Sequence, residues 1–393
     1  MMSKKVPELR FKGFTDDWEE RKLGEHAKYR RGSFPQPYGN KEWYDGEGAM
    51  PFVQVVDVTN KLTLVENTKQ KISKLAQSKS VFVPKGTVVV TLQGSIGRVA
   101  ITQYDSFVDR TLLIFEDYEK ETDERFWAYT IQKKFEIEKL KAPGGTIKTI
   151  TKEALSSFDV HLPQFKEQAK IGSFFKQLDE TIALHQRKLD LLKEQKKGFL
   201  QKMFPKNGAK VPELRFKGFT DEWEERKLSD IADRFDNLRV PITASDRKPG
   251  DTPYYGANGI QDYVEGFTHN GEFILVAEDG ANDLKNYPVQ YVNGKVWVNN
   301  HAHVLQGKKT ITDNKFLMNA IKNFNIEPFL VGGGRAKLNA DVMMKLNILL
   351  PTFVEQEKIG SFFKQLDDTI ALHQRKLDLL KEQKKGFLQK MFV

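Results

Sequence analysis

The sequence lacks several features that would narrow its function quickly. Its 393 residues include no cysteine, which excludes disulfides and thiolate metal sites. No apolar run reaches the roughly 18 residues of a membrane span, and the N-terminus has no apolar signal-peptide core. Neither a GxxxxGK[ST] phosphate loop nor a [DNS]PP[YFW] tetrapeptide is present. We therefore expect a cytoplasmic protein, not associated with membranes, that has no catalytic residues and binds no cofactor itself.

A strongly basic segment is also lacking, although the net charge is +9. Residues 163–204 and 351–393 carry surpluses of four and two positive charges, whereas residues 24–162 carry +2 and residues 229–350 carry −1. If the last two segments bind nucleic acid, they must do so through local groups, with a partner supplying further phosphate contacts.

What the chain does contain is a two-fold duplication. Residues 6–23 recur as residues 211–228 with one change, and residues 163–204 recur as residues 351–392 with four changes in 42 positions. Between these repeats lie two segments that share little sequence. Two copies are too few for a solenoid, so the pattern indicates a duplicated framework with two different inserts.

The inserts resemble each other only near their ends. Each reads as a helix, a Gly-Gly loop, a short helix and a strand before a proline. We expect the helices at residues 123–141, after a Thr122 cap, and at residues 313–323, after Thr312. The two domains are thus predicted to share a fold and to present different surfaces.

The longer repeat has the period of a coiled coil, because apolar residues recur in alternating steps of four and three. The predicted seam of the first copy consists of Ile171, Phe175, Leu178, Ile182, His185, Leu189, Leu192, Phe199 and Met203, with Lys196 in a polar position. The second copy gives Ile359, Phe363, Leu366, Ile370, His373, Leu377, Leu380, Phe387 and Met391, with Lys384 in the equivalent position. We expect the two helices to pack antiparallel about a pseudo-two-fold axis.

The order of variable domain, long helix, variable domain and long helix resembles the DNA specificity subunits of type I restriction–modification systems. Short strings agree with this resemblance: QAKI at residues 168–171 before LDETI at 178–182, YYGANGI at 254–260 and NNHAHV at 299–304. The resemblance extends over essentially the whole chain.

The resemblance implies an α+β fold in which two α/β target recognition domains are separated by two long conserved helices. On that basis residues 1–162 and 205–350 form the domains with their short repeats, and residues 163–204 and 351–393 form the helices. Each domain would read half of a bipartite sequence in double-stranded DNA, while the helices set the gap. The helices would also dock two adenine methyltransferase subunits that bring S-adenosylmethionine. Restriction subunits would bring ATP and Mg.

In the first domain, the candidate DNA contacts are a glycine-containing loop and a pair of arginines. Gln93, Ser95 and Arg98 stand in the loop QGSIGR between two apolar strands, and glutamine and arginine can pair with adenine and guanine. The alternative is a plain hairpin turn with a solvated arginine. Arg30 and Arg31 are further candidates, together with Thr146 and Lys148 after the Gly-Gly loop.

In the second domain, the candidates are polar residues in three loops. They are Asn282 and Lys285, the pair His301 and His303, and Arg335 and Lys337 after a glycine run. The alternative for that glycine run is a helix C-cap, and phosphate contact is favoured over it. The two histidines lack a third ligand at a recognisable spacing, so a polar surface shared on one strand face is favoured over a metal site.

His185 and His373 occupy seam positions in the middle of the helices, where a polar residue specifies register. We expect that structural role, and expect the two rings to face each other if the helices cross there. Two alternatives to the specificity subunit stay open: a coiled-coil scaffold with two protein-binding heads, and a methyltransferase that binds S-adenosylmethionine itself.

Overall fold

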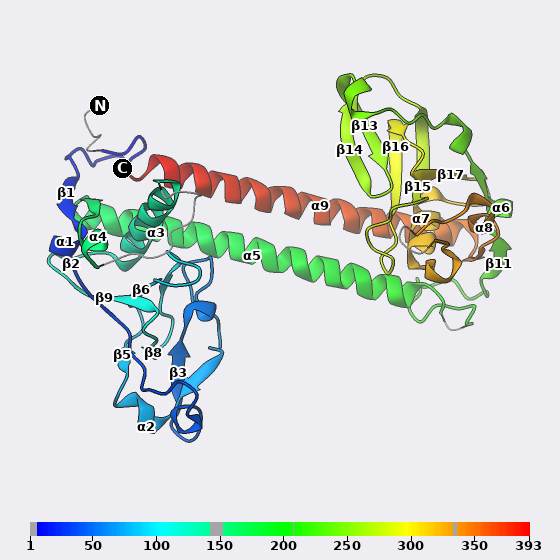
Figure 1. Cartoon of the computed structure of the whole chain (residues 1–393). Helices are drawn as coiled ribbons and strands as arrows, with labels where there is room; N and C mark the ends of the chain where they lie inside the picture. The colour runs from blue at the N-terminus through cyan, green and yellow to red at the C-terminus, as the bar shows by residue number, and fades with distance from the viewer. Residues whose placement is uncertain (1–5, 142–151, 207, 333–335) are drawn as a thin grey trace. The chain divides into compact units, whose positions relative to one another are not determined.

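The computed structural model describes residues 6–141, 152–206, 208–332 and 336–393 (Figure 1). It divides into two compact units, Met1–His185 with Leu377–Val393, and Gln186–Lys376. Each unit holds one variable segment, one short repeat and parts of both long helices, α5 (Phe165–Met203) and α9 (Phe353–Lys390). The predicted α+β fold with two long helices is confirmed.

Each short repeat ends in a strand that pairs with the last strand of its domain. In the first unit β1 (Glu19–Lys22) is antiparallel to β10 (Asp159–Leu162). In the second unit β11 (Glu224–Lys227) pairs with β18 (Asn347–Leu350) in the same register. The strand predicted before each proline is thus one half of a ribbon whose other half is the short repeat.

The helix of each domain is capped one residue later than the sequence predicts. α3 (Glu124–Lys141) and α7 (Asn314–Asn323) follow Asp123 and Asp313, whose carboxylates accept hydrogen bonds from the amides of Phe126 (2.8 Å) and Phe316 (2.7 Å). The prediction of Thr122 and Thr312 as caps is wrong because an aspartate follows each threonine and makes the bond. Short helices α4 (Lys152–Ser156) and α8 (Ala340–Met343) follow.

The same aspartates pack against the start of the long helices. Gln168 accepts a hydrogen bond from the Asp123 amide at 3.2 Å, and Gln356 accepts one from the Asp313 amide at 3.1 Å. The start of α3 lies so close to α5 that a Cβ added at Gly172 of α5 would be 2.1 Å from Oδ1 of Asp123. The glutamine and the glycine of this repeated string therefore serve helix packing.

Two four-stranded sheets form the variable part of the first unit. One has the order β2 (Ala27–Arg31), β9 (Leu112–Tyr118), β6 (Val88–Thr91), β7 (Val99–Ile101). The other has the order β4 (Gln70–Ile72), β3 (Met50–Val53), β8 (Ser106–Val108), β5 (Val81–Val83). Short helices α1 (Leu23–His26) and α2 (Lys74–Gln77) lie between strands. Alternate residues of β6 and β9 face two cores, one against α3 and one against the second sheet.

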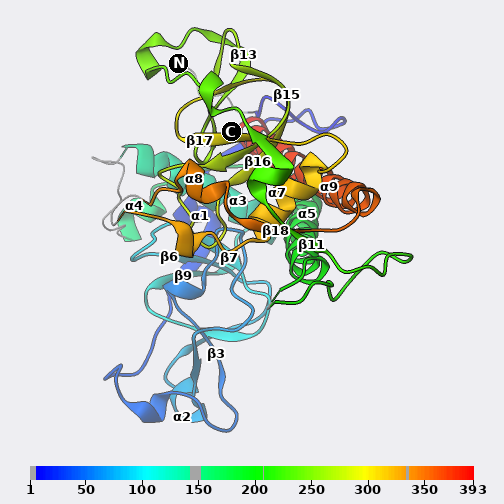
Figure 2. The ribbon, with the colours of Figure 1, turned by 90° about the vertical axis from the view of Figure 1, so that its right-hand side faces the viewer.

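A single six-stranded sheet forms the variable part of the second unit. Its order is β12 (Ala232–Arg234), β17 (Ala302–Gly307), β15 (His269–Ala277), β16 (Val289–Val298), β13 (Pro249–Gly256), β14 (Gly259–Val264). It is preceded by α6 (Leu228–Ile231). Ile274 and Val276 pack in the core shared with α7, which lies beside β16 (Figure 2), whereas Phe273 and Leu275 face a second core. The pairing pattern nevertheless matches that of the first unit, with β15 in place of β5 and β6 and β16 in place of β7 and β8. The prediction that the two domains share a fold is confirmed.

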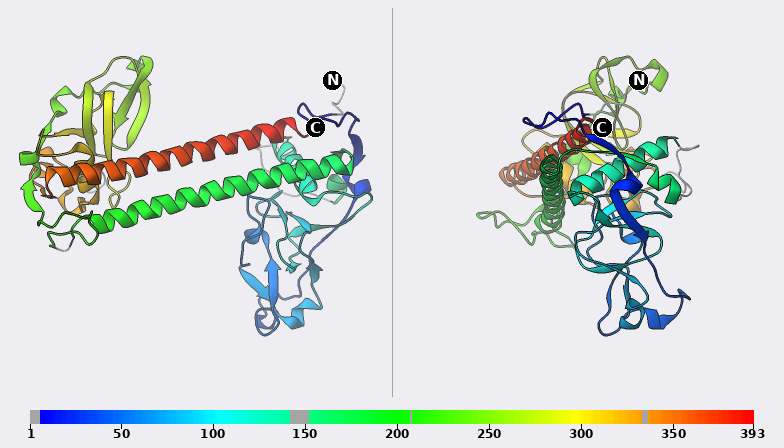
Figure 3. Two further views of the ribbon diagram at one scale, coloured as in Figure 1. Left: turned by 180° about the vertical axis from the view of Figure 1, so that it is seen from behind. Right: turned by 90° about the vertical axis from the view of Figure 1, so that its left-hand side faces the viewer.

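Within each unit, α5 and α9 lie side by side and run antiparallel (Figure 3). In the first unit the rings of Phe174 and Phe387 are 5.1 Å apart, and in the second those of Phe199 and Phe362 are also 5.1 Å apart. Every predicted seam residue is buried or half-buried. His185 and His373 are both half-buried and belong to different units.

The two lysines in polar seam positions form cross-helix ion pairs. Nζ of Lys384 lies 2.6 Å from Asp179 in the first unit, and Nζ of Lys196 lies 2.5 Å from Asp367 in the second. Each pair matches one seam position with one carboxylate, so it fixes the local register of the two helices.

A buried ion pair attaches each short repeat to a long helix. Arg10 donates two hydrogen bonds to Glu167, at 2.6 and 2.7 Å, and Arg215 donates two to Glu355, both at 2.7 Å. The glutamate side chains are 1% and 0% exposed. Each repeat also forms a hydrogen bond to the last turn of the other long helix. The Leu9 amide donates to the Lys390 carbonyl of α9, and the Leu214 amide donates to the Lys202 carbonyl of α5, both at 2.8 Å.

In the part of the chain that the structure describes, no helix is both long and apolar enough to cross a membrane.

We expect Glu355→Ala to destabilise the second unit by about 3–5 kcal/mol, because it leaves the nearly buried Arg215 guanidinium without its partner. The midpoint of denaturant unfolding, followed by a fluorophore or tryptophan signal in that unit, measures the change.

Glu224→Ala is the matched control, since it removes an exposed glutamate from the pair with Arg226. It should change the free energy of unfolding by less than about 1 kcal/mol. Equal effects of the two variants would contradict a structural role for the buried pair.

Candidate DNA interface

Several candidate residues of the first unit lie at one end of the sheet formed by β2, β9, β6 and β7. Arg31, at the end of β2, pairs in register with Leu113, and Thr91, at the end of β6, pairs with Leu112. The loop of residues 92–98 joins β6 to β7 at this end. The structure therefore brings Arg31 and the QGSIGR loop to the same end of the sheet.

This loop has a backbone that is held from inside the domain. Thr91 accepts a hydrogen bond from the Arg98 amide (3.0 Å) and donates one to the Ser95 carbonyl (2.5 Å). Ile96 is 5% exposed, and a Cβ at Gly97, whose φ is +79°, would lie 2.7 Å from Phe135. The loop is a hairpin turn with an ordered backbone, in which Gln93 is exposed and Ser95 and Arg98 are half-buried.

The other first-domain candidates differ in their surroundings. Arg30 lies in β2, with its Nε 2.5 Å from the Glu116 carboxylate of β9. Arg31 is exposed. Thr146 and Lys148 lie outside the described residues.

Arg110 was missed by the sequence reasoning and lies in the turn before β9, at the same sheet end. Its guanidinium stands 5.0 Å from the ring of Tyr38, whose hydroxyl donates to the buried Asp109. Burial, and then the hydrogen bond to Asp109, raise the pKa of Tyr38. The sequence feature that could have identified Arg110 is its place in a short turn between two apolar runs. The contact with Tyr38 holds its guanidinium in position.

In the second unit, the loop that carries Asn282 and Lys285 is tied to the β13–β14 turn. Asn258 of that turn donates to the Gly280 carbonyl and accepts from the Asn282 amide, both at 2.9 Å. Asp283 accepts from the Lys285 amide at 2.9 Å. Asn282 and Lys285 are both exposed, so a hydrogen-bonded loop presents two polar side chains.

His301 and Lys337 join this group through Asp279. Nδ1 of His301 lies 2.5 Å from Oδ1 of Asp279, and the backbone of Asp279 forms a bridge with that of Lys337. The structure thus brings Asn282, His301 and Lys337 around one loop. Arg335 lies outside the described residues.

His303 is not available for DNA contact, so that prediction is wrong. The residue is 1% exposed, with Nδ1 2.7 Å from Asp236 and Nε2 2.8 Å from the Leu338 carbonyl. His301 precedes β17, which begins at Ala302. The two histidines therefore do not share a strand face, and each has its own carboxylate partner.

His303 is part of an internal polar cluster, with Asp236, Glu278, Arg239 and Lys337. Glu278 accepts from Arg239 at 2.6 Å and lies 3.0 Å from Lys337. Burial alone would raise the pKa of Asp236 and of Glu278, but hydrogen bonds from His303 to the former and from Arg239 and Lys337 to the latter leave both pKa values lowered. The cluster therefore ties Lys337 and the Glu278 loop to the sheet.

Ligand atoms of Asp236, Glu278 and His303 lie within 4.8 Å of one another, which is close enough for a metal ion. The guanidinium of Arg239 already contacts both carboxylates, at 2.6 Å from Glu278 and 3.6 Å from Asp236. Since arginine and lysine supply the positive charge that a cation would bring, the chemistry of this group favours a structural clamp.

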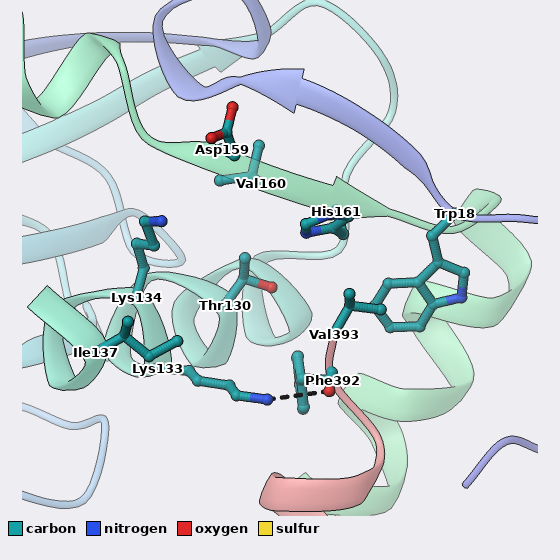
Figure 4. A pocket seen from close by; sticks show the side chains of 10 residues that line it. All are labelled: Trp18, Thr130, Lys133, Lys134, Ile137, Asp159, Val160, His161, Phe392 and Val393. Carbon is teal, nitrogen blue, oxygen red and sulfur yellow. Dashed lines mark hydrogen bonds between the residues drawn. The ribbon is translucent and has the colours of Figure 1, made fainter. Parts of the chain in front are cut away.

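A small cavity lies in the first unit where β10, α3 and the end of α9 meet (Figure 4). Its volume is about 30 Å³, room for about one water. Lys133 donates to the Phe392 carbonyl at 3.0 Å, and burial lowers the pKa of this lysine. This cavity is too small for a nucleotide cofactor and belongs to the framework.

The chain matches a known family twice. The model of the type I restriction modification DNA specificity domain matches residues 15–194 and residues 220–382.

Two curated relatives are similar. A putative type I restriction enzyme specificity subunit, S.HindORF215P of Haemophilus influenzae, is 44% identical over 167 residues, a match that spans 42% of either chain. The type I restriction enzyme MjaVIII specificity subunit of Methanocaldococcus jannaschii is 20% identical over 404 residues, covering 95% of this chain and 91% of the relative.

Solved structures share the fold. The type I restriction–modification S subunit from M. genitalium has a TM-score of 0.70 at 17% identity and covers 99% of both chains. A chain from a study of complex assembly and conformational transition of the type I system has a TM-score of 0.52 at 15% identity, covering 96% of this chain and 98% of that one. With the family model matched once in each half of the duplicated sequence, the chain belongs to the type I restriction–modification DNA specificity family, as a non-catalytic specificity subunit.

Proposed function

We propose that each variable domain reads one half of a bipartite, asymmetric sequence in double-stranded DNA. The observation that carries this proposal is that one framework, repeated down to its Arg–Glu pair, helix cap and strand pairing, presents different polar loops in the two domains. A framework kept constant under two unlike surfaces suits two heads that bind unlike sequences.

The exposed and half-buried polar groups of these loops have the chemistry of base and phosphate recognition. In the first domain, Gln93 and Arg98 can each make two hydrogen bonds to a base edge, and Arg31 and Arg110 can contact phosphates. In the second, Asn282 and His301 can contact bases, and Lys285 and Lys337 can contact phosphates. Because few cations are involved, affinity requires phosphate contacts from a partner as well.

The paired helices are proposed to set the unread gap and to dock two methyltransferase subunits. Each helix buries its seam yet leaves two leucines exposed seven residues apart, Leu184 and Leu191 on α5 and Leu372 and Leu379 on α9. An exposed apolar repeat of this kind suits helices of another subunit. In this proposal S-adenosylmethionine is bound by the methyltransferase subunits, ATP and Mg by restriction subunits, and no cofactor by this chain.

The competing function is a coiled-coil scaffold with two protein-binding heads. The framework suits both functions, whereas two clusters of asparagine, glutamine, arginine and histidine held on hydrogen-bonded loops favour DNA. Methylation mapping separates them, since a scaffold would direct no sequence-specific modification.

Replacing residues 24–162 with the corresponding segment of another family member should change one half of the methylated sequence and leave the other half unchanged. The hybrid is expressed with the methyltransferase, and N6-methyladenine is mapped across the genome. A motif changed in both halves would contradict two independent heads.

Single substitutions should act on one half-site only. Arg98→Ala should reduce discrimination in the first half, and Asn282→Ala or His301→Ala in the second, each by about 1–3 kcal/mol. Lys85→Ala is the control, because Lys85 is exposed in the turn before β6, at the other end of that strand from the loop. If the control relaxed recognition as much as Arg98→Ala, the QGSIGR loop would not be the reader.

Inserting one heptad at the middle of both α5 and α9 should lengthen the gap, since seven helical residues add about 10 Å. Methylome mapping should then give the same half-sites at a larger spacing. Insertion into α5 alone is the control, because it shifts Lys196 and Asp179 relative to Asp367 and Lys384 and should abolish methylation. An unchanged gap in the double insertion would contradict the proposal that the length of the paired helices sets the gap.

A further inference from the structure

The internal duplication allows α3 and α7 to be compared residue by residue. Both helices start after an aspartate cap that bonds to a glutamine of the long helix. Counting from these caps, Tyr129 corresponds to Asn319 and Gln132 to Lys322. The second domain has therefore lost an aromatic ring and gained a cation at neighbouring positions.

In the first unit, Tyr129 fills the space between α3 and the long helices. It is 1% exposed and its hydroxyl donates to Asp179. Nζ of Lys384 stands 5.0 Å from the ring of Tyr129 and 2.6 Å from Asp179. The ring, the carboxylate and the ammonium thus satisfy one another.

In the second unit, the corresponding space is a cavity of about 380 Å³. Asn319, which is 0% exposed, lines it and donates from Nδ2 to the Lys315 carbonyl at 2.8 Å. Its Oδ1 has no hydrogen-bond partner among the described residues. Burying an acceptor without a partner is unfavourable, so a ligand that donates a hydrogen bond to it is favoured.

The cavity also has more positive than negative charge. The lining residues that carry charge are Lys196, Lys315, Lys322, Lys364, Asp367 and Asp368. Asp367 is bound by Lys196 at 2.5 Å and Asp368 by Lys364 at 2.6 Å. Burial, and then the charge of Lys196, lower the pKa of Lys322, although Asp367 opposes this. An anion in the cavity would offset this repulsion.

We propose that this cavity binds a small phosphate compound that also offers a hydroxyl group. Lys322 and Lys315 would bind the phosphate oxygens, and Oδ1 of Asn319 would accept the hydroxyl hydrogen. Inorganic phosphate carries such a hydroxyl itself, and a nucleoside monophosphate carries it on the sugar. A carboxylate ion or sulfate has the charge without the donor and should bind more weakly. This site is confined to the second domain, because Tyr129 occupies its counterpart in the first, and it does not depend on the proposed function.

The test is calorimetric titration of inorganic phosphate into the full chain at about pH 7, with the ionic strength held constant by sodium chloride. Lys322→Gln and Asn319→Tyr install the residues of the first domain and should each weaken binding at least about tenfold. Lys309→Gln, which removes an exposed lysine outside the cavity, is the matched control and should bind as the parent does.

Adenosine monophosphate and sulfate distinguish the ligand. Tighter binding of adenosine monophosphate than of phosphate supports a nucleotide as the source, and the reverse supports free phosphate. Sulfate that binds as tightly as phosphate would overturn the role of Asn319. The proposal is overturned as a whole if phosphate does not bind above the chloride background, or if both cavity variants bind it like the control. If the parent chain does not bind phosphate and both cavity variants lose binding to duplex DNA, the proposal is also overturned, because the cavity then contacts the sugar-phosphate backbone of DNA.

Discussion

The structure depends on a buried ion pair between the short repeat and the long helix. Arg10 and Glu167 form it in the first unit, and Arg215 and Glu355 in the second, in each case through two hydrogen bonds to a carboxylate that is almost fully buried. A charge buried this deeply is tolerated only with its partner in place. The pair therefore fixes where the short repeat docks, and through it where β1 and β11 begin.

This arrangement separates what is constant from what varies. The docked repeat supplies one strand of a two-stranded ribbon whose other strand ends the domain, and the cap of α3 or α7 packs against the same helix. Between those points the strand pairing is the same in both units, whereas the strand lengths and the loops differ. In the first unit the strands are shorter and form two sheets, and in the second they are continuous in one sheet with a polar cluster around His303.

The sequence predicted the framework well because repetition and period carry physical meaning. Alternating steps of four and three residues identified a seam whose members are buried or half-buried. The carboxylate partners of Lys196 and Lys384 lie off the seam, so the period could not identify them. The caps were predicted one residue early, because threonine and aspartate are both good caps and only geometry decides between neighbours.

The variable domains were less predictable for a related reason. Alternation along a strand cannot say which of its residues other segments cover, and His303 is buried by its contacts with Asp236 and Leu338. Arg110 was missed because its position depends on Tyr38, which is distant in sequence. Contacts between distant residues, such as Asn258 with Asn282, created the candidate surfaces and left no local pattern.

The central claim is that two unlike heads on one framework read two half-sites. The most direct measurement is the map of N6-methyladenine in a host without other adenine methyltransferases, expressing this chain together with the methyltransferase subunit that the proposal assigns to it. The account predicts one split motif, with two different half-sites and a fixed unread gap. An uninterrupted motif, two identical half-sites or no sequence-specific methylation would contradict it.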